Sequence, residues 1–352
     1  MNSNSLYKSY VVDIILPPAI IVSPITLTIG YTLTFILDYF LIKHDTKLSP
    51  FISPTELRYA IGIYHFLLPT LFASKYDFGN ISFMLHPWST AAQVVFLAKA
   101  NLPVKDWIIM FFKTVTFQDD SPTNKTANEI RIDGLKKAAR GLLKFAFMKI
   151  FLDGLLPKDL SDLLTLPFYS PKALFITYIL AVRIYCMLGV TDIVMGIAQS
   201  LSLIRFKDVF DNPFIASSPK DFWNKRWNRL VSHMFHQFIF TKMSTKKPKQ
   251  PTKFARIKAG LLIFAISGLF HDFMIAAATR TITFELTVFF LIHGMVVALE
   301  ATYRTGKFKS DPTGINHIIC NMLTVLFFTT TGRLFLSPIL RQQVFLRIAQ
   351  QF

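Results

Sequence analysis

The segment from residue 259 to residue 279 constrains the fold of this chain more than any other. It is built almost entirely from apolar residues, and its only ionisable side chains are His271 and Asp272. About 20 apolar residues in a helix are enough to cross the roughly 30 Å hydrocarbon core of a bilayer. The segment therefore predicts a membrane-spanning helix that carries an imidazole and a carboxylate in its interior.

Apolar stretches recur along the rest of the chain. The chain is 52% hydrophobic and only 17% charged, whereas about a quarter of the residues of a soluble domain are charged. Further stretches expected to form membrane helices are residues 11–41, 59–73, 81–100, 173–204, 284–301 and 317–331. They predict an all-α fold, a polytopic membrane helical bundle with about seven to nine transmembrane helices.

Three intervening segments do not fit a simple membrane helix. Residues 107–116 form a short amphipathic stretch that is expected to lie at the membrane surface. Residues 119–140 carry both signs of charge and are expected to form a polar loop. Residues 141–156 are apolar but contain Lys144, Lys149 and Asp153, which makes them a poor candidate for a span. No internal repeat or separate soluble domain is visible, so we expect one membrane unit over residues 1–352.

The formal net charge of +17 raises the question of a nucleic-acid partner, but the distribution of the charge argues against one. Between residues 216 and 258 there are eleven Lys or Arg and one acid, Asp221. Basic residues beside membrane segments usually mark the cytoplasmic side and attract anionic lipid head groups. A role in holding an anionic soluble ligand is compatible with this interpretation, and both stay open.

Several residue types indicate no special chemistry. Cys186 and Cys320 lie in apolar segments without metal-ligand spacing, so neither a disulfide framework nor a metal site is expected. The N-terminal segment lacks a small-residue cleavage site and is interpreted as a retained membrane segment.

Four histidines in apolar surroundings are interpreted as structural: His65, His86, His293 and His317. Arg183, Asp192 and Glu300 are expected to pair across helices, and Asp13 and Asp38 to lie near helix ends.

His271 is the first candidate for chemistry. In a helix that begins near residue 259 it lies roughly 18 Å along the axis, near the bilayer midplane. Ser267 and Gly268 precede it by four and three residues and share its face, which is small and suited to packing or to lining a cavity. Ionisable groups at this depth usually face a bundle interior. A neutral imidazole there suits a general base, and a structural histidine bonded across helices with Asp272 stays the alternative.

The second candidate is the segment NPFIASSPKDFWNKRWNRL, residues 212–230. Ser217 or Ser218 is placed to cap a helix that opens at Pro219. In a continuous helix Trp223 and Trp227 would share one face, as would Lys225 and Arg229. An amphipathic helix at the cytoplasmic interface explains this pattern, but it gives no reason for Asn228.

Together the two segments resemble the wax synthase branch of the membrane-bound O-acyltransferase superfamily. The resemblance rests on an ordered pair of motifs, with 43 residues between Asn228 and His271, and it covers about residues 205–300. The matching residues are Asn212, Pro213, Phe214, Ser217, Ser218, Asp221, Phe222, Trp223, Arg226, Trp227 and Asn228, then Ser267, Gly268, His271 and Asp272. The acid after the histidine is often Glu in plant members, whereas here it is Asp272.

The resemblance implies a single membrane-embedded O-acyltransferase domain over residues 1–352. Its catalytic core would span residues 205–300, around an intramembrane reaction chamber. Such enzymes usually reside in the endoplasmic reticulum membrane and transfer a fatty acyl group from acyl-CoA, as co-substrate, to a lipophilic alcohol. His271 would be the catalytic residue and Asn228 its partner. The substrate-binding candidates are Trp223, Trp227, Ser267, Asp272, Lys225 and Arg226, and the location of the basic region adds Lys220 and Arg229 as phosphate contacts.

No metal or tightly bound cofactor is expected, and Walker, GxSxG and HExxH motifs are missing from the sequence. A long-chain alcohol is the default acceptor, with a sterol or a terpenoid alcohol as alternatives. Two other classes stay open at this point. One is a transporter whose buried polar residues line a pathway, and the other is an inactive membrane scaffold that kept the fold.

Overall fold

The computed structural model describes residues 8–76, 79–80, 84–97, 101–235, 252–304 and 310–342. It is mostly α-helical, which confirms the predicted all-α class. The strands in this part of the chain are two-residue pairs: β1 (Ile14–Ile15) pairs with β4 (Thr281–Ile282), and β2 (Ile20–Ile21) with β3 (Phe72–Ala73). The chain folds into two compact units. Unit 1 comprises Met1–Val115, Ser267–Thr287 and Pro338–Phe352, and unit 2 comprises Thr116–Ile266 and Val288–Ser337.

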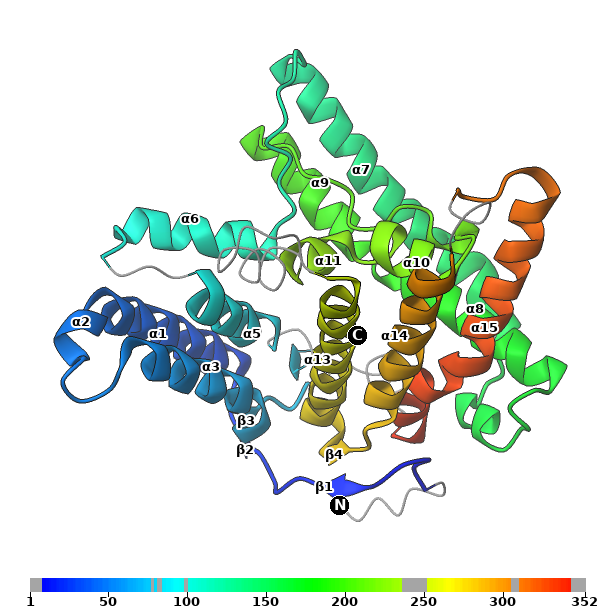
Figure 1. Cartoon of the computed structure of the whole chain (residues 1–352), viewed down its shortest axis with the longest axis horizontal. Helices are drawn as coiled ribbons and strands as arrows, with labels where there is room; N and C mark the ends of the chain where they lie inside the picture. The colour runs from blue at the N-terminus through cyan, green and yellow to red at the C-terminus, as the bar shows by residue number, and fades with distance from the viewer. Residues whose placement is uncertain are drawn as a thin grey trace. The chain divides into compact units, whose positions relative to one another are not determined.

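Unit 1 is built on N-terminal helices with well-formed caps. Its elements are α1 (Pro24–Lys43), α2 (Asp45–Leu48), α3 (Pro54–Leu71), α5 (Leu85–Ala92), the π-helical turn η1 (Gln93–Leu97) and α6 (Val104–Val115) (Figure 1). Ser53 and Glu56 form a capping box, and Pro54 occupies the first helical position of α3. The core of this unit is formed by Tyr39, Ile42, Leu57, Ile61, Val94 and Trp107.

Three long helices contribute to both units. They are α13 (Lys253–Thr279), α14 (Glu285–Tyr303) and α15 (Gly314–Arg341). In unit 1 the carboxylate of Glu285, which is fully buried, accepts from both terminal nitrogens of Arg341 at 2.5 and 2.6 Å and from the backbone N–H of Tyr10 at 2.7 Å. Residues from the beginning, the middle and the end of the chain therefore meet at one carboxylate.

Unit 2 contains α7 (Ala127–Phe147), α8 (Pro171–Met187) and α9 (Val190–Ser202), with the π turn η2 (Met148–Leu152) and the short 3-10 helices η3 (Asp153–Leu155) and η4 (Leu160–Leu164). Helices α7 and α9 run side by side (Figure 1). They approach closely because glycines of each helix lie against the backbone of the other. A Cβ atom on Gly196 would lie 2.5 Å from the carbonyl oxygen of Gly134, and a Cβ atom on Gly141 would lie 2.6 Å from the carbonyl oxygen of Gly189.

The predicted polar loop over residues 119–140 is wrong, because α7 begins at Ala127. A capping box between Thr126 and Glu129 starts this helix. Its charges are neutralised within the unit: Arg140 contacts Asp192 and Asp208 at 2.8 Å each, and Lys144 contacts Asp192 at 2.7 Å. Charge alone therefore does not indicate a loop where the opposite charges lie on a neighbouring helix. The expected amphipathic helix at residues 107–116 is present as α6.

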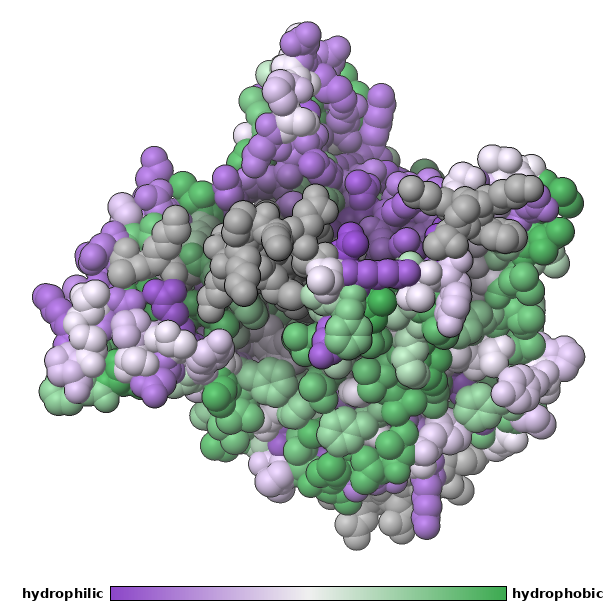
Figure 2. All heavy atoms as spheres, in the orientation of Figure 1, coloured by the Kyte–Doolittle hydropathy of each residue, from purple (hydrophilic) through white to green (hydrophobic). Residues whose placement is uncertain are grey.

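Five helices of the described residues are long and apolar enough to cross a membrane: Pro24–Lys43, Pro171–Ser202, Lys253–Thr279, Glu285–Tyr303 and Gly314–Arg341. They confirm a polytopic helical membrane protein, although this criterion finds fewer helices than the seven to nine expected. Within unit 2, Figure 2 shows hydrophobic residues over α14 and α15 and hydrophilic residues over the free ends of α7 and α9.

Candidate active site

The segment of residues 212–230 does not form the continuous amphipathic helix that its pattern predicts. After the 3-10 turn η5 (Pro213–Ile215) it forms one turn, α10 (Pro219–Asp221), and a π turn, η6 (Phe222–Arg226). Trp227 is extended, Asn228 has a positive φ of 42°, and α11 (Arg229–Phe235) then begins. The predicted cap is confirmed, because the hydroxyl of Ser218 accepts from the backbone N–H of Asp221 at 3.1 Å.

The amphipathic pattern of the sequence did not explain why an asparagine stands at position 228. In the structure Asn228 lies at the break between η6 and α11. A positive φ is costly for most residues, and Asn is one of the few that tolerate it. Its side-chain oxygen accepts from the backbone N–H of Val231 at 3.3 Å, as an N-terminal cap does. Because the oxygen is used in this way, the amide NH₂ points away from the helix end and can donate to another group.

Both tryptophans of this segment pack inside unit 2. The indole N–H of Trp223 donates to Nδ1 of His293 at 3.1 Å, and Nε2 of His293 lies 2.9 Å from the hydroxyl of Thr331. That hydroxyl donates to the carbonyl of Phe327 at 2.9 Å, so it accepts from Nε2. His293 is thus a neutral, fully bonded structural histidine, as expected. Trp227 stacks on Phe222 with a centroid distance of 5.3 Å.

Two polar residues on distant helices fix the rest of the segment. The carboxylate of Glu300 on α14 accepts from the hydroxyl of Ser218 at 2.6 Å and from the backbone N–H of Lys220 at 3.0 Å. The side-chain amide of Asn321 on α15 donates to the carbonyls of Phe214 and Ala216 at 2.8 and 2.9 Å. No motif in the sequence had pointed to Asn321. Glu300 was expected to pair across helices, and it instead caps α10 and contacts Arg304 at 3.2 Å.

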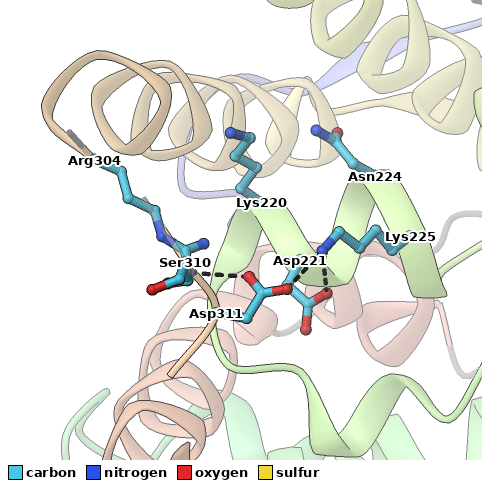
Figure 3. A pocket seen from close by; sticks show the side chains of 7 residues that line it. All are labelled: Lys220, Asp221, Asn224, Lys225, Arg304, Ser310 and Asp311. Atoms are coloured by element: carbon cyan, nitrogen blue, oxygen red, sulfur yellow. Dashed lines mark hydrogen bonds and ion pairs between the residues drawn. The ribbon is translucent and has the colours of Figure 1, made fainter. Parts of the chain in front are cut away.

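A polar cavity of about 410 Å³ adjoins this segment in unit 2 (Figure 3). Its lining residues are Lys220, Asp221, Asn224, Lys225, Arg304, Ser310 and Asp311. Lys225 and Arg304 contact Asp311 at 2.9 and 3.0 Å. The hydrogen bond from Lys225, reinforced by Arg304, holds the pKa of the Asp311 carboxyl below its usual range. Asp311 is therefore ionised at neutral pH, in contact with two cations.

The cationic residues predicted to contact phosphate differ in how they are held. Arg226 is bound at 2.7 Å by Asp221, which is buried, and so it supports the turn itself. Lys225 is paired with the exposed Asp311. Lys220 extends into the cavity away from both acids in Figure 3, and no ion pair involves it within the described part of the chain.

His271 lies on α13, in unit 1. Its Nδ1 is 2.7 Å from the carbonyl oxygen of Ser267, one turn earlier. A carbonyl can only accept, so this bond places a proton on Nδ1, and Nε2 carries the lone pair in the neutral ring. Ser267, a predicted substrate contact, therefore orients the imidazole through its backbone. The neighbouring ring of Phe270 lies 3.8 Å from Trp88 of α5, centroid to centroid.

Asp272 caps the start of α14. Its Oδ2 accepts from the backbone N–H and the hydroxyl of Thr287 at 2.8 and 2.6 Å, and the residue is only 2% exposed. The interhelical partner that the sequence left open for Asp272 is thus Thr287. Asn228 belongs to unit 2 and His271 to unit 1.

Comparison with known proteins finds a similarity to one family in the part of the chain that contains Asn228 and His271. Residues 206–292 match the model of the membrane bound O-acyl transferase family. The chain is 26% identical over 294 residues to probable long-chain-alcohol O-fatty-acyltransferase 2 of Arabidopsis thaliana, a match that covers 81% of this chain and 82% of that protein.

Other relatives match over shorter stretches. Probable long-chain-alcohol O-fatty-acyltransferase 9 of Arabidopsis thaliana is 29% identical over 163 residues, 46% of this chain and 47% of that protein. The long-chain-alcohol O-fatty-acyltransferase of Simmondsia chinensis is 30% identical over 152 residues, 41% of each. In these two matches the chain spans under half of the relative's length. The matches confirm that this chain resembles the wax synthase-like branch of the membrane-bound O-acyltransferase superfamily.

Proposed function

We propose that the protein is an alcohol O-acyltransferase that esterifies a lipophilic alcohol. The observation that carries the proposal is the family match over residues 206–292, which contains both Asn228 and His271. The relatives are named as long-chain-alcohol O-fatty-acyltransferases, and this favours a long-chain alcohol over a sterol or a terpenoid alcohol as acceptor. It also favours an enzyme over a transporter or an inactive scaffold.

In the proposed mechanism Nε2 of His271 removes the hydroxyl proton of the alcohol as the alcohol oxygen attacks the acyl thioester carbonyl. The tetrahedral intermediate collapses with cleavage of the carbon–sulfur bond, and the imidazolium returns the proton to the leaving thiolate. The products are the ester and the free thiol. The hydrogen bond from Nδ1 to the Ser267 carbonyl at 2.7 Å supports this role, because it fixes the tautomer that a base acting through Nε2 requires. No metal or cofactor takes part in these steps.

Asn228 would donate its amide N–H to the oxyanion of the tetrahedral intermediate. The contact of its side-chain oxygen with Val231 supports this assignment, because that contact orients the NH₂ group away from the helix end. A donor of this kind contributes roughly 2.7–4 kcal/mol to transition-state stabilisation.

Acyl-CoA is the proposed donor, and the cavity lined by Lys220 and Lys225 is the proposed contact for its phosphates. A phosphate has the charge to replace Asp311, whose carboxylate already contacts Lys225 and Arg304. The ion pair of Arg226 with the buried Asp221 then has a supporting role, which revises the predicted phosphate contact of Arg226. The endoplasmic reticulum membrane is the proposed location.

The test is acyl transfer in membranes from cells that lack neutral-lipid synthesis. Membranes with the full chain receive radiolabelled palmitoyl-CoA and hexadecanol, and the ester is identified by mass spectrometry. His271→Ala is expected to lower the rate about 10²–10⁴-fold, the usual contribution of a general base. His317→Ala, which changes a histidine of α15 outside the site, is the control and should leave the rate unchanged. Full activity of His271→Ala would exclude the mechanism.

A further inference from the structure

Unit 1 contains a buried histidine–carboxylate pair, far along the chain from His271. Asp38 lies on α1 and His65 on α3, and both side chains have no exposed surface. Nε2 of His65 is 2.5 Å from Oδ2 of Asp38. The hydroxyl of Tyr64 donates to the other carboxylate oxygen, and its ring stacks on His65 with a centroid distance of 4.3 Å. The sequence pattern had suggested a structural histidine and an aspartate near a helix end.

These contacts determine which nitrogen of His65 is left for another partner. The carboxylate accepts from both Nε2 and the Tyr64 hydroxyl, so Nε2 carries a proton and Nδ1 is the ring nitrogen left for another partner. Nδ1 is buried and has no hydrogen-bond partner among the described residues. Buried polar atoms are nearly always hydrogen-bonded in native proteins, so Nδ1 points to a group that the described residues do not supply.

The helix backbone beside His65 also lacks one regular hydrogen bond. Pro69 lies inside α3, four residues after His65. Proline has no N–H, so the bond that a regular helix would give to the His65 carbonyl is missing. The helix around His65 is therefore irregular on its C-terminal side. Ile61 of the unit 1 core precedes His65 by one helical turn, so an apolar side chain lies on the same face of α3.

We propose that Asp38 and His65 form a binding site for the hydroxyl group of a lipophilic alcohol, with Nδ1 of His65 as its hydrogen-bond acceptor. The site rests on the proposed function in that this alcohol is the acyl acceptor, which would bind here before its hydroxyl proton passes to Nε2 of His271. The negative charge of Asp38 disfavours fatty acids and phosphates. The apolar helices disfavour charged amines, because a buried charge needs a full set of partners. A neutral hydroxyl on an apolar chain satisfies both conditions.

The substitution that isolates Nδ1 is His65→Gln. A glutamine amide can keep the hydrogen bond to Asp38 that Nε2 makes, but its acceptor is a carbonyl oxygen on a flexible chain and does not occupy the ring position of Nδ1. His86→Gln is the matched control, because His86 lies in the same unit, accepts the same substitution and hydrogen-bonds to the Tyr31 carbonyl, at 3.3 Å, while its ring packs on Phe35 and Phe111. Both variants are compared with the wild-type chain, in nanodiscs, for melting temperature and for binding.

Binding is measured with hexadecanol that carries a diazirine near the hydroxyl, in the absence of acyl-CoA. The matched probe is the alkane diazirine without the hydroxyl. The alcohol probe is expected to label peptides of α1 and α3 at least tenfold more than the alkane does. His65→Gln should reduce this labelling to the alkane level, and His86→Gln should leave it unchanged. In the transfer assay His65→Gln should raise KM for the alcohol about tenfold, with kcat and KM for acyl-CoA little changed.

Two results with the wild-type chain alone would overturn the proposed site. One is labelling outside α1 and α3, and the other is equal labelling by the alcohol probe and the alkane probe. Undiminished labelling of a folded His65→Gln would do the same. A collapse of kcat at unchanged KM would assign His65 to chemistry instead of binding and would also contradict the proposal. Wild-type protein that binds the alcohol at α1 and α3 but transfers no acyl group would refute the proposed function alone.

Discussion

Asn228 has one role through its backbone and a proposed second role through its side chain, and substitutions can distinguish the two. Its φ of 42° and its cap on Val231 shape the turn before α11, while its NH₂ group is the proposed oxyanion donor. Asn228→Gly keeps the left-handed backbone and loses the carboxamide, at a capping cost of only a few tenths of a kcal/mol. We expect a near-normal melting temperature and a rate lowered about 10²–10³-fold, measured as ester formation.

Asn212 provides the matched control for that substitution. It is also an asparagine with a φ of 42°, it is exposed, and it has no part in the proposed chemistry. Asn212→Gly should therefore leave both the melting temperature and the rate close to wild type. If Asn228→Gly retained the wild-type rate, the oxyanion role would be refuted and the residue would be a structural turn former.

At the residue scale the sequence predicted buried positions better than it predicted the contacts made there. The buried position of Asp272 was readable from its apolar segment, but its bond to Thr287 depends on how α14 packs. Asp38 and His65 are 27 positions apart, and no local pattern connects them. Such pairs arise from tertiary packing, which a single sequence without covariation does not contain.

At the scale of elements, the contact between α7 and α9 depends on glycine. A Cβ on Gly196 would lie 2.5 Å from the backbone nitrogen of Ala138, closer than atoms can pack. Gly196→Ala is therefore expected to destabilise the protein by about 1–3 kcal/mol, as overpacking does, seen as a lower melting temperature in detergent. Gly260→Ala on α13 is the control, since nothing lies within 4 Å of its added Cβ. Equal melting temperatures for the two variants would contradict the close packing.

Helix α7 shows why part of the fold could not be predicted from the sequence. The apolar segments identified the long helices of the C-terminal half, because length and hydropathy are local properties. Helix α7 is polar, and its T-x-x-E start signal at Thr126–Glu129 was outweighed by its many charges. Those charges are tolerated because Asp192 and Asp208 neutralise them. The break at Trp227–Asn228 was missed for a related reason, since periodicity does not reveal a π turn.

At the scale of the whole chain, Glu285 joins distant segments of unit 1. It is fully buried, and Arg341 is 4% exposed at the side chain. Removing one member of a buried pair leaves an uncompensated charge and costs about 3–5 kcal/mol. Arg341→Met should therefore lower the melting temperature strongly. The double variant Glu285→Met/Arg341→Met should recover part of the loss, but not the bond from Tyr10. A double variant as unstable as the sum of the two single variants would show that the pair is not coupled.

The bond between Asp272 and Thr287 has a consequence for how the protein can move. A membrane helix is free to slide along its axis or to rotate unless something pins it. Two hydrogen bonds to one buried carboxylate pin α13 to the first turn of α14, one residue away from the imidazole. The depth and rotation of His271 are thereby set by the scaffold. In the proposed mechanism, alcohols of different length would therefore all meet the same nitrogen at the same height.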